Sequence, residues 1–217
     1  MTEQDPTATP ADVDTTETDE TPEIAAAMAA DALVPLDVEV APQPKSAPDD
    51  REQRGPFDVA EVTGVRPYID LGGVKVLPRA DLHLRLEVEE ATKRVVAVGL
   101  EYHGTTLQVQ PFAAPRSSGL WHDIREQIME QLRKQGAKAK PANGPFGPEI
   151  FAEIPVNQDG QQGWRLARFI GVDGPRWFLR GVIAGKGATD AEAANEVEEL
   201  FRSIVVVRGT SPMPPRD

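Results

Sequence analysis

Arginines are the residues of this chain whose types and spacing suggest a binding site. Arg116 precedes Ser117 and Ser118 at the predicted start of a helix, where free backbone amides can hold a phosphate or a carboxylate. Arg176 and Arg180 are four residues apart in a predicted strand, so their side chains share one face of the sheet. If the helix packs over that face, Arg116 can meet the two arginines at its rim, and the five residues form an anion-binding cluster.

Guanidinium groups beside aromatic side chains suit planar anions, nucleotides or single-stranded nucleic acid. The alternative is that the arginines pair with Asp123, Glu149 or Asp173 and cap the core, since structural ion pairs are commoner than sites. Outside the first 53 residues the chain has equal numbers of acidic and basic side chains, which disfavours broad affinity for nucleic acid.

An apolar centre on the same predicted face gives a second candidate site. Phe178 and Val182 alternate with the arginines, and Arg168 on the neighbouring strand is expected to point to that face as well. Apolar side chains inside a basic rim are typical of protein-binding patches. We therefore predict that Phe178, Val182 and Arg168 bind a protein partner or a second copy of the chain.

Catalytic and metal-binding patterns are weak in this sequence. His83, His103 and His122 lack neighbouring ligands at metal-binding spacing, and no nucleophile elbow or phosphate-binding loop motif occurs. The absence of cysteine excludes disulfides, thiolate catalysis and cysteine-bound metals. We expect no catalytic residue, no metal and no cofactor, and keep an enzyme of unrecognised type as a third hypothesis.

The first 53 residues predict a disordered acidic tail. They contain fourteen acidic and two basic residues and almost no aromatic ones, so they cannot bury enough surface to offset the entropy of ordering. Within the tail, residues 23–33 are alanine-rich and could form a short helix on a partner. We predict one domain over residues 54–210 and a proline-rich extension over residues 211–217. No basic leader or long apolar run is visible, which favours a cytoplasmic location without a membrane span.

Periodicity and turn signals predict an α+β domain with a mainly antiparallel sheet packed by two helices. One helix begins at Ser117 or Ser118 and stops at Gly136, and the other begins with a capping box at Thr189. Asp173-Gly174 between two apolar runs predicts a hairpin. The predicted strands are 82–88, 95–102, 106–112, 149–156, 164–172, 176–184 and 205–207, with a loop before Pro148.

Four segments together resemble a known family: F-A-A-P-R-S-S-G-L-W (112–121), N-G-P-F-G-P-E (143–149), G-V-D-G-P-R-W-F-L-R-G (171–181) and V-V-V-R-G (205–209). This is an actinobacterial family catalogued as domain of unknown function 3710, and the resemblance implies no activity. Separately, the order of strands and helices is similar to the Mog1/PsbP-like sandwich, whose members are mostly binding or assembly proteins.

The sequence therefore favours a non-enzymatic cytoplasmic module that binds a protein partner or assembles with itself. The alternative is a nucleotide- or nucleic-acid-associated protein that uses the anion-binding cluster.

Overall fold

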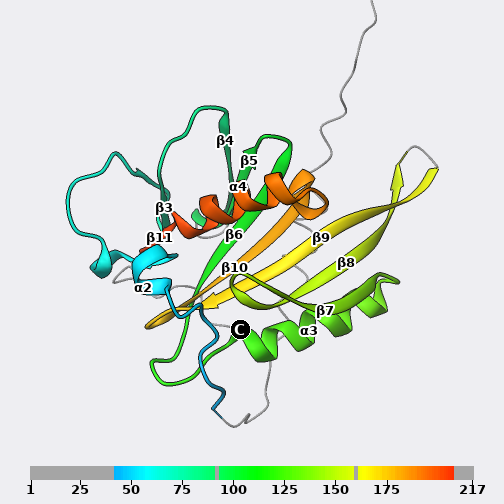
Figure 1. Cartoon of the computed structure of the whole chain (residues 1–217), viewed down its shortest axis with the longest axis horizontal. Coiled ribbons are helices and arrows are strands. Elements are labelled where there is room, and N and C mark those ends of the chain that lie inside the picture. Colours follow the sequence, from blue (N-terminus) through cyan, green and yellow to red (C-terminus); the bar gives the residue numbers. More distant parts are fainter. Residues whose placement is uncertain (1–41, 91–92, 159–160, 208–217) are drawn as a thin grey trace, which may run out of the picture.

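The computed structural model describes residues 42–90, 93–158 and 161–207. They form an α+β fold built on a seven-stranded sheet in which every neighbouring pair is antiparallel, as the sequence predicts (Figure 1). From one edge to the other, the strands are β4 (Leu82–Glu89), β5 (Arg94–Tyr102), β6 (Thr105–Ala113), β10 (Trp177–Gly185), β9 (Gln161–Asp173), β8 (Gly147–Gln158) and β7 (Lys138–Gly144).

Tight turns set the register of the meander. His103 and Gly104 both have positive φ, 49° and 76°, and form a two-residue loop between the paired residues Tyr102 and Thr105. Positive φ at both positions suits the right-handed twist of the joined strands. The predicted hairpin after Asp173 is also confirmed, because β9 and β10 pair from Asp173 and Phe178 onward.

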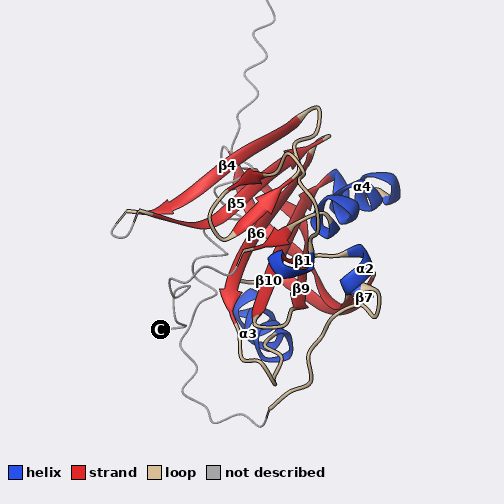
Figure 2. Ribbon diagram, turned by 90° about the vertical axis from the view of Figure 1, so that its left-hand side faces the viewer, coloured by secondary structure: helices blue, strands red, loops and turns tan. Residues whose placement is uncertain are grey.

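Two helices lie on opposite faces of the sheet (Figure 2). Helix α3 (Trp121–Lys134) packs on β7, β8 and β9, and helix α4 (Ala191–Arg202) packs behind β6 and β10. Both are predicted, but each begins later than expected. The cap of α4 is Asp190, whose carboxylate accepts a hydrogen bond from the amide of Ala193 at 2.9 Å, because Thr189 is the C-cap of the preceding 3₁₀ turn, η2 (Lys186–Ala188).

A second, small sheet lies beside α4. Its order is β1 (Phe57–Asp58), β11 (Val205–Val206), β3 (Val74–Val76) and β2 (Ile69–Asp70). The closing strand predicted at 205–207 therefore exists, but it joins this sheet and pairs in parallel with β1. The strands of this sheet are two or three residues long, too short to show periodicity.

Residues 42–53 pack against the domain. They were expected to belong to the acidic tail, but they cross the end of the sheet and continue into α2 (Arg51–Arg54) and the 3₁₀ turn η1 (Val59–Glu61). Arg51 is buried, and the amide of Gly119 donates to the carbonyl of Gln43 at 2.8 Å. We call residues 42–61 the N-terminal strap. Residues 1–41, including the predicted helix at 23–33, and the extension at 211–217 lie outside the described residues.

Candidate functional site

The start of α3, which the sequence offers to an external anion, is capped by the chain itself. The carboxylate of Asp173 accepts hydrogen bonds from the amides of Leu120 at 2.8 Å and Trp121 at 3.4 Å. It also accepts the amide of Ser46 in the N-terminal strap at 3.0 Å. Because Asp173 is only 3% exposed, these amides are not open to another anion. The amides of Leu120 and Trp121 are therefore occupied by Asp173 rather than by an external anion.

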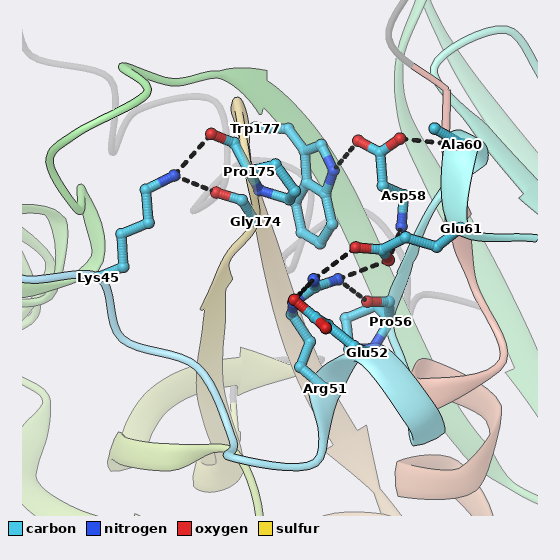
Figure 3. A network of polar contacts seen from close by, with 10 residues as sticks. All are labelled: Lys45, Arg51, Glu52, Pro56, Asp58, Ala60, Glu61, Gly174, Pro175 and Trp177. Atoms are coloured by element: carbon cyan, nitrogen blue, oxygen red, sulfur yellow. Dashed lines mark hydrogen bonds and ion pairs between the residues drawn. The ribbon is translucent and has the colours of Figure 1, made fainter.

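Asp173 is held in an environment that is costly for its charge. Burial raises the pKa of this carboxyl above its usual value, although the three amides and Lys45 counteract the shift. The ammonium group of Lys45 donates to the carbonyls of Gly174 and Pro175, the latter at 2.7 Å (Figure 3). The hairpin turn, the strap and the helix start are thus joined by one polar network.

A second network fixes the rest of the strap. The guanidinium of Arg51 donates to both carboxylate oxygens of Glu61, at 2.8 and 2.6 Å, and lies 5.7 Å from the Trp177 ring centre (Figure 3). The indole nitrogen of Trp177 donates to Asp58 at 2.9 Å. Burial alone would raise the pKa of Glu61, but hydrogen bonds from Arg51 and the Asp58 amide outweigh it and hold the pKa below its usual value.

The apolar patch predicted around Phe178 is covered. Phe178 is 0% exposed, and its ring stacks with Trp121 of α3 at 5.7 Å and with Phe112 at 6.0 Å between ring centres. Val182 is buried in the same cluster beneath α3. The prediction of an open docking surface here is wrong, because sequence periodicity shows that two residues share a face but not whether a helix covers it.

Arg168 lies on the opposite face from the predicted patch. In the register of β9 and β10 it pairs with Ile183, and side chains of directly opposed residues point to the same side of a sheet. Its guanidinium contacts Glu149 at 3.0 Å and Glu198 of α4 at 2.7 Å, and all three groups are nearly buried. Arg168 is therefore part of a structural ion triad between β8, β9 and α4.

The five residues of the predicted anion-binding cluster are not brought together. Arg180 is 2% exposed, donates to Gln110 at 2.5 Å and lies beside the Phe112 ring, and burial lowers its pKa to about 10. Arg176 is exposed on the same face, about 13 Å along the strand, with Phe178 between them.

Arg116 and Ser117 are exposed, and Ser118 is partly buried. The amide of Ala114 donates to the Arg176 carbonyl at 3.1 Å, which brings the two exposed arginines to the same end of the sheet. No ion pair of Arg116 or Arg176 occurs within the described residues. The structure thus reduces the predicted cluster to an exposed basic pair and a buried arginine.

The two edges of the seven-stranded sheet differ in a way that the sequence did not indicate. At one edge, β7 carries Pro141 at its centre and the exposed lysines Lys138 and Lys140. At the other edge, β4 has neither proline nor lysine, and its Leu86 and Val88 are each 46% exposed. Within the described chain, no strand pairs with the outer side of β4. The alternation L-H-L-R-L-E-V-E predicts this strand, but not that it ends the sheet.

In the described part of the chain, no three histidine, aspartate or glutamate side chains gather as a metal ion would need. His103 contacts Glu196 at 2.8 Å and His122 contacts Glu126 at 3.5 Å. None of the helices in the described ranges is long and apolar enough to cross a membrane.

Comparison with solved structures finds distant matches. A protein from Bacteroides thetaiotaomicron VPI-5482, solved at 1.50 Å, is 12% identical with a TM-score of 0.38. That match covers 65% of this chain and 48% of that protein, so the chain spans about half the length of its relative. Cyanobacterial PsbP (CyanoP) from Synechocystis sp. PCC 6803 is 13% identical with a TM-score of 0.34, over 62% of this chain and 86% of that one.

Comparison with curated proteins finds no match. A family model described as "Protein of unknown function (DUF3710)" matches residues 55–217, which include the four segments that carry the resemblance. The actinobacterial source stays a prediction, since the match bears only on the family. The chain belongs to the DUF3710 family.

Proposed function

We propose that this protein is a non-enzymatic cytoplasmic binding module that adds a partner's β-strand to the outer edge of β4. The observation that carries the proposal is the contrast between the two sheet edges. An edge strand presents unpaired N–H and C=O groups, and proteins commonly protect such edges with proline, lysine or a covering element. β7 carries proline and lysine, whereas β4 has neither and presents eight residues with Leu86 and Val88 exposed, and its pairing with β5 shifts register between Glu87 and Val88.

Strand addition would use the outer backbone of β4 and its exposed apolar side chains. The backbone of the edge supplies hydrogen bonds to an extended segment, and alternate side chains select the partner. On one face the partner would meet Leu84, Leu86 and Val88, and on the other Arg85 and Glu87. This edge replaces the surface around Phe178 as the place where a protein partner binds.

The interior supports a structural rather than a catalytic role for the charged groups. Asp173 caps α3, Arg168 bridges β8 and α4 through two glutamates, and Arg51 joins α2 to η1 through Glu61. Perturbed ionisable groups are often catalytic, but they also arise from structural ion pairs. Here each one joins separate elements of the fold.

A photo-crosslinking amino acid placed at Leu86 in the full-length protein tests the proposal in a lysate of the native cells. The same group at Lys140 of β7 is the matched control, since both positions are exposed on edge strands. We expect covalent adducts from position 86 and none from position 140. Adducts from neither position, or equal yields from both, would contradict binding at β4.

The exposed pair Arg116 and Arg176 supports a second candidate function, the binding of a polyanion such as nucleic acid at the end of the sheet. Its supporting observation is that both residues are exposed at the same end of the sheet without an ion pair in the described chain. We expect Arg116→Ala/Arg176→Ala to lose any salt-sensitive binding of a single-stranded oligonucleotide that the wild type shows. Arg133→Ala, at an exposed arginine of α3, is the control. No binding by the wild type at low salt rejects this candidate.

A further inference from the structure

We infer that the partner strand is β4 of a second copy of this chain, paired antiparallel about a two-fold axis through Leu86. This inference rests on the proposed function, because it names the occupant of the same edge. A two-fold axis perpendicular to the sheet makes neighbouring strands antiparallel and keeps each face of the sheet on its own side. The two seven-stranded sheets then continue into one another.

The apolar face of β4 is complementary to itself in this register. Leu86 lies opposite its own counterpart on the axis, and Leu84 lies opposite Val88 of the other copy. Leu86 and Val88 are each 46% exposed in the single chain, while Leu84 is half-buried at the rim of the core. Pairing therefore removes exposed apolar surface that extends this core, which favours association.

The polar face is complementary in charge in the same register. Arg85 lies opposite Glu87 of the other copy, and His83 lies opposite Glu89. The carboxylate of Glu87 already accepts a hydrogen bond from the Gln108 side-chain amide at 2.5 Å, and its charge also acts on buried Arg180. Arg85 and Glu89 already interact within their own chain, so each would divide its contacts between its own chain and the other copy. Opposite charges directly across two strands stabilise the pair, and like charges destabilise it.

Adjacent symmetric registers lose this complementarity. An axis through Arg85 sets the two copies of Arg85 against each other, and an axis through Glu87 does the same with Glu87. An axis through Leu84 sets His83 against Arg85, and one through Val88 sets Glu87 against Glu89. Registers shifted by half a step place apolar residues opposite charged ones, because side chains alternate between faces with a period of two. Among these symmetric registers, the axis through Leu86 alone matches both faces.

The size of the contact predicts a weak association. Seven paired residues, 83–89, span about 24 Å, and the surface they bury is small beside the roughly 800 Å² per partner of a stable interface. We therefore expect a dimer that depends on protein concentration.

Single-cysteine variants of the full-length chain test the register, since the native sequence contains no cysteine. In Leu86→Cys the two Cα atoms would lie about 4.5–5.5 Å apart, within disulfide range. In Arg85→Cys the two cysteines would be diagonal, at about 8 Å, which is beyond that range. We expect a covalent dimer for Leu86→Cys under mild oxidation, and little for Arg85→Cys or for the edge control Lys140→Cys.

Charge reversal tests the polar face by sedimentation equilibrium of the purified protein. Arg85→Glu sets like charges across both symmetry-related pairs, and we expect about tenfold weaker dimerisation. The double variant Arg85→Glu/Glu87→Arg restores opposite charges and is expected to restore dimerisation. Circular dichroism of each variant controls for folding.

The inference is overturned if the purified wild type stays monomeric and Leu86→Cys gives no covalent dimer. It is also overturned if Arg85→Cys crosslinks as readily as Leu86→Cys, or if a folded double variant does not recover. Photo-crosslinking from position 86 separates the two proposals. An adduct with a different protein alone removes the second copy but keeps strand addition at β4, whereas no adduct removes both.

Discussion

The corner formed by the β9–β10 turn around Asp173 and the outer edge of β4 differ in whether their polar groups already have partners within the fold. At the corner, the carboxylate of Asp173 and the ammonium of Lys45 bind backbone groups of the strap, the turn and α3. At the β4 edge, apolar side chains face solvent and the outer backbone has no strand partner within the described chain. The corner has the more conspicuous sequence motif, yet its groups are occupied by the fold itself. A binding surface is better sought where interactions remain to be made.

The largest expected effect on stability comes from removing the buried ion triad of Arg168, Glu149 and Glu198. Arg168→Ala leaves Glu149 and Glu198 as nearly buried carboxylates without their cation. We expect the free energy of unfolding to fall by about 3–5 kcal/mol. Arg176→Ala, at an exposed arginine, is the control and should change it by less than about 0.5 kcal/mol. Equal effects in urea denaturation would contradict the assignment of the two arginines.

A smaller loss is expected from crowding the contact between α3 and the sheet. A Cβ atom at Gly171 would lie 2.5 Å from the Trp121 ring and 2.8 Å from the Phe178 ring. We expect Gly171→Ala to destabilise the fold by about 1–3 kcal/mol. Gly163→Ala in the same strand is the control, since its nearest contact is Val156 at an ordinary 3.6 Å. Thermal unfolding of the two variants gives the comparison, and a tolerated Gly171→Ala would show that α3 is not packed as described.

The contributions of Asp173 and Glu61 to stability should change with pH in opposite directions. The pKa of Asp173 is raised on folding, so wild-type stability relative to Asp173→Asn is greatest in acid and declines as pH rises through the folded pKa. The pKa of Glu61 is lowered on folding. The stability of the wild type relative to Glu61→Gln is therefore greatest above the usual pKa of a glutamate and declines as pH falls through the folded pKa. Urea titrations between about pH 3 and 7 measure both differences. Slopes of the same sign would contradict these environments.

The smallest effect on stability, and the sharpest on association, is expected at the open edge. Leu86→Lys introduces a charge of the kind that protects β7, at a side chain that is half exposed. We expect the free energy of unfolding to change by less than about 0.5 kcal/mol while dimerisation is lost. Thr63→Lys, in an exposed loop, is the control that adds the same charge elsewhere. Loss of dimerisation in both variants would point to net charge rather than to β4.

Much of the fold follows from local signals in the sequence. The core strands and both long helices have clear periodicity, and the Asp173-Gly174 turn marks the β9–β10 hairpin. β7 was missed because Pro141 and two lysines obscure a strand that needs only one paired side. The sequence does not reveal that residues 42–53 of the strap are ordered, because their composition is acidic. Arg51 is buried by contacts with Glu61 and Trp177, which form only when the chain folds.

The candidate site was less predictable because it depends on register and coverage. The sequence places Arg168 on the wrong face of the sheet. The length of the β9–β10 turn sets which residue of β9 pairs with Ile183, and this register decides the face on which Arg168 lies. Phe178 was assigned to an open face, although α3 covers it. The position of β4 at the sheet edge follows only from the order of all seven strands.

Hydrogen exchange of backbone amides at increasing protein concentration tests binding at the β4 edge most directly. The outward amides of β4 should become more protected as concentration rises, while those of β7 exchange at an unchanged rate, because only β4 gains a strand partner. Leu86→Lys should abolish the concentration dependence. Unchanged exchange of β4, or equal protection of both edges, would contradict self-pairing through β4.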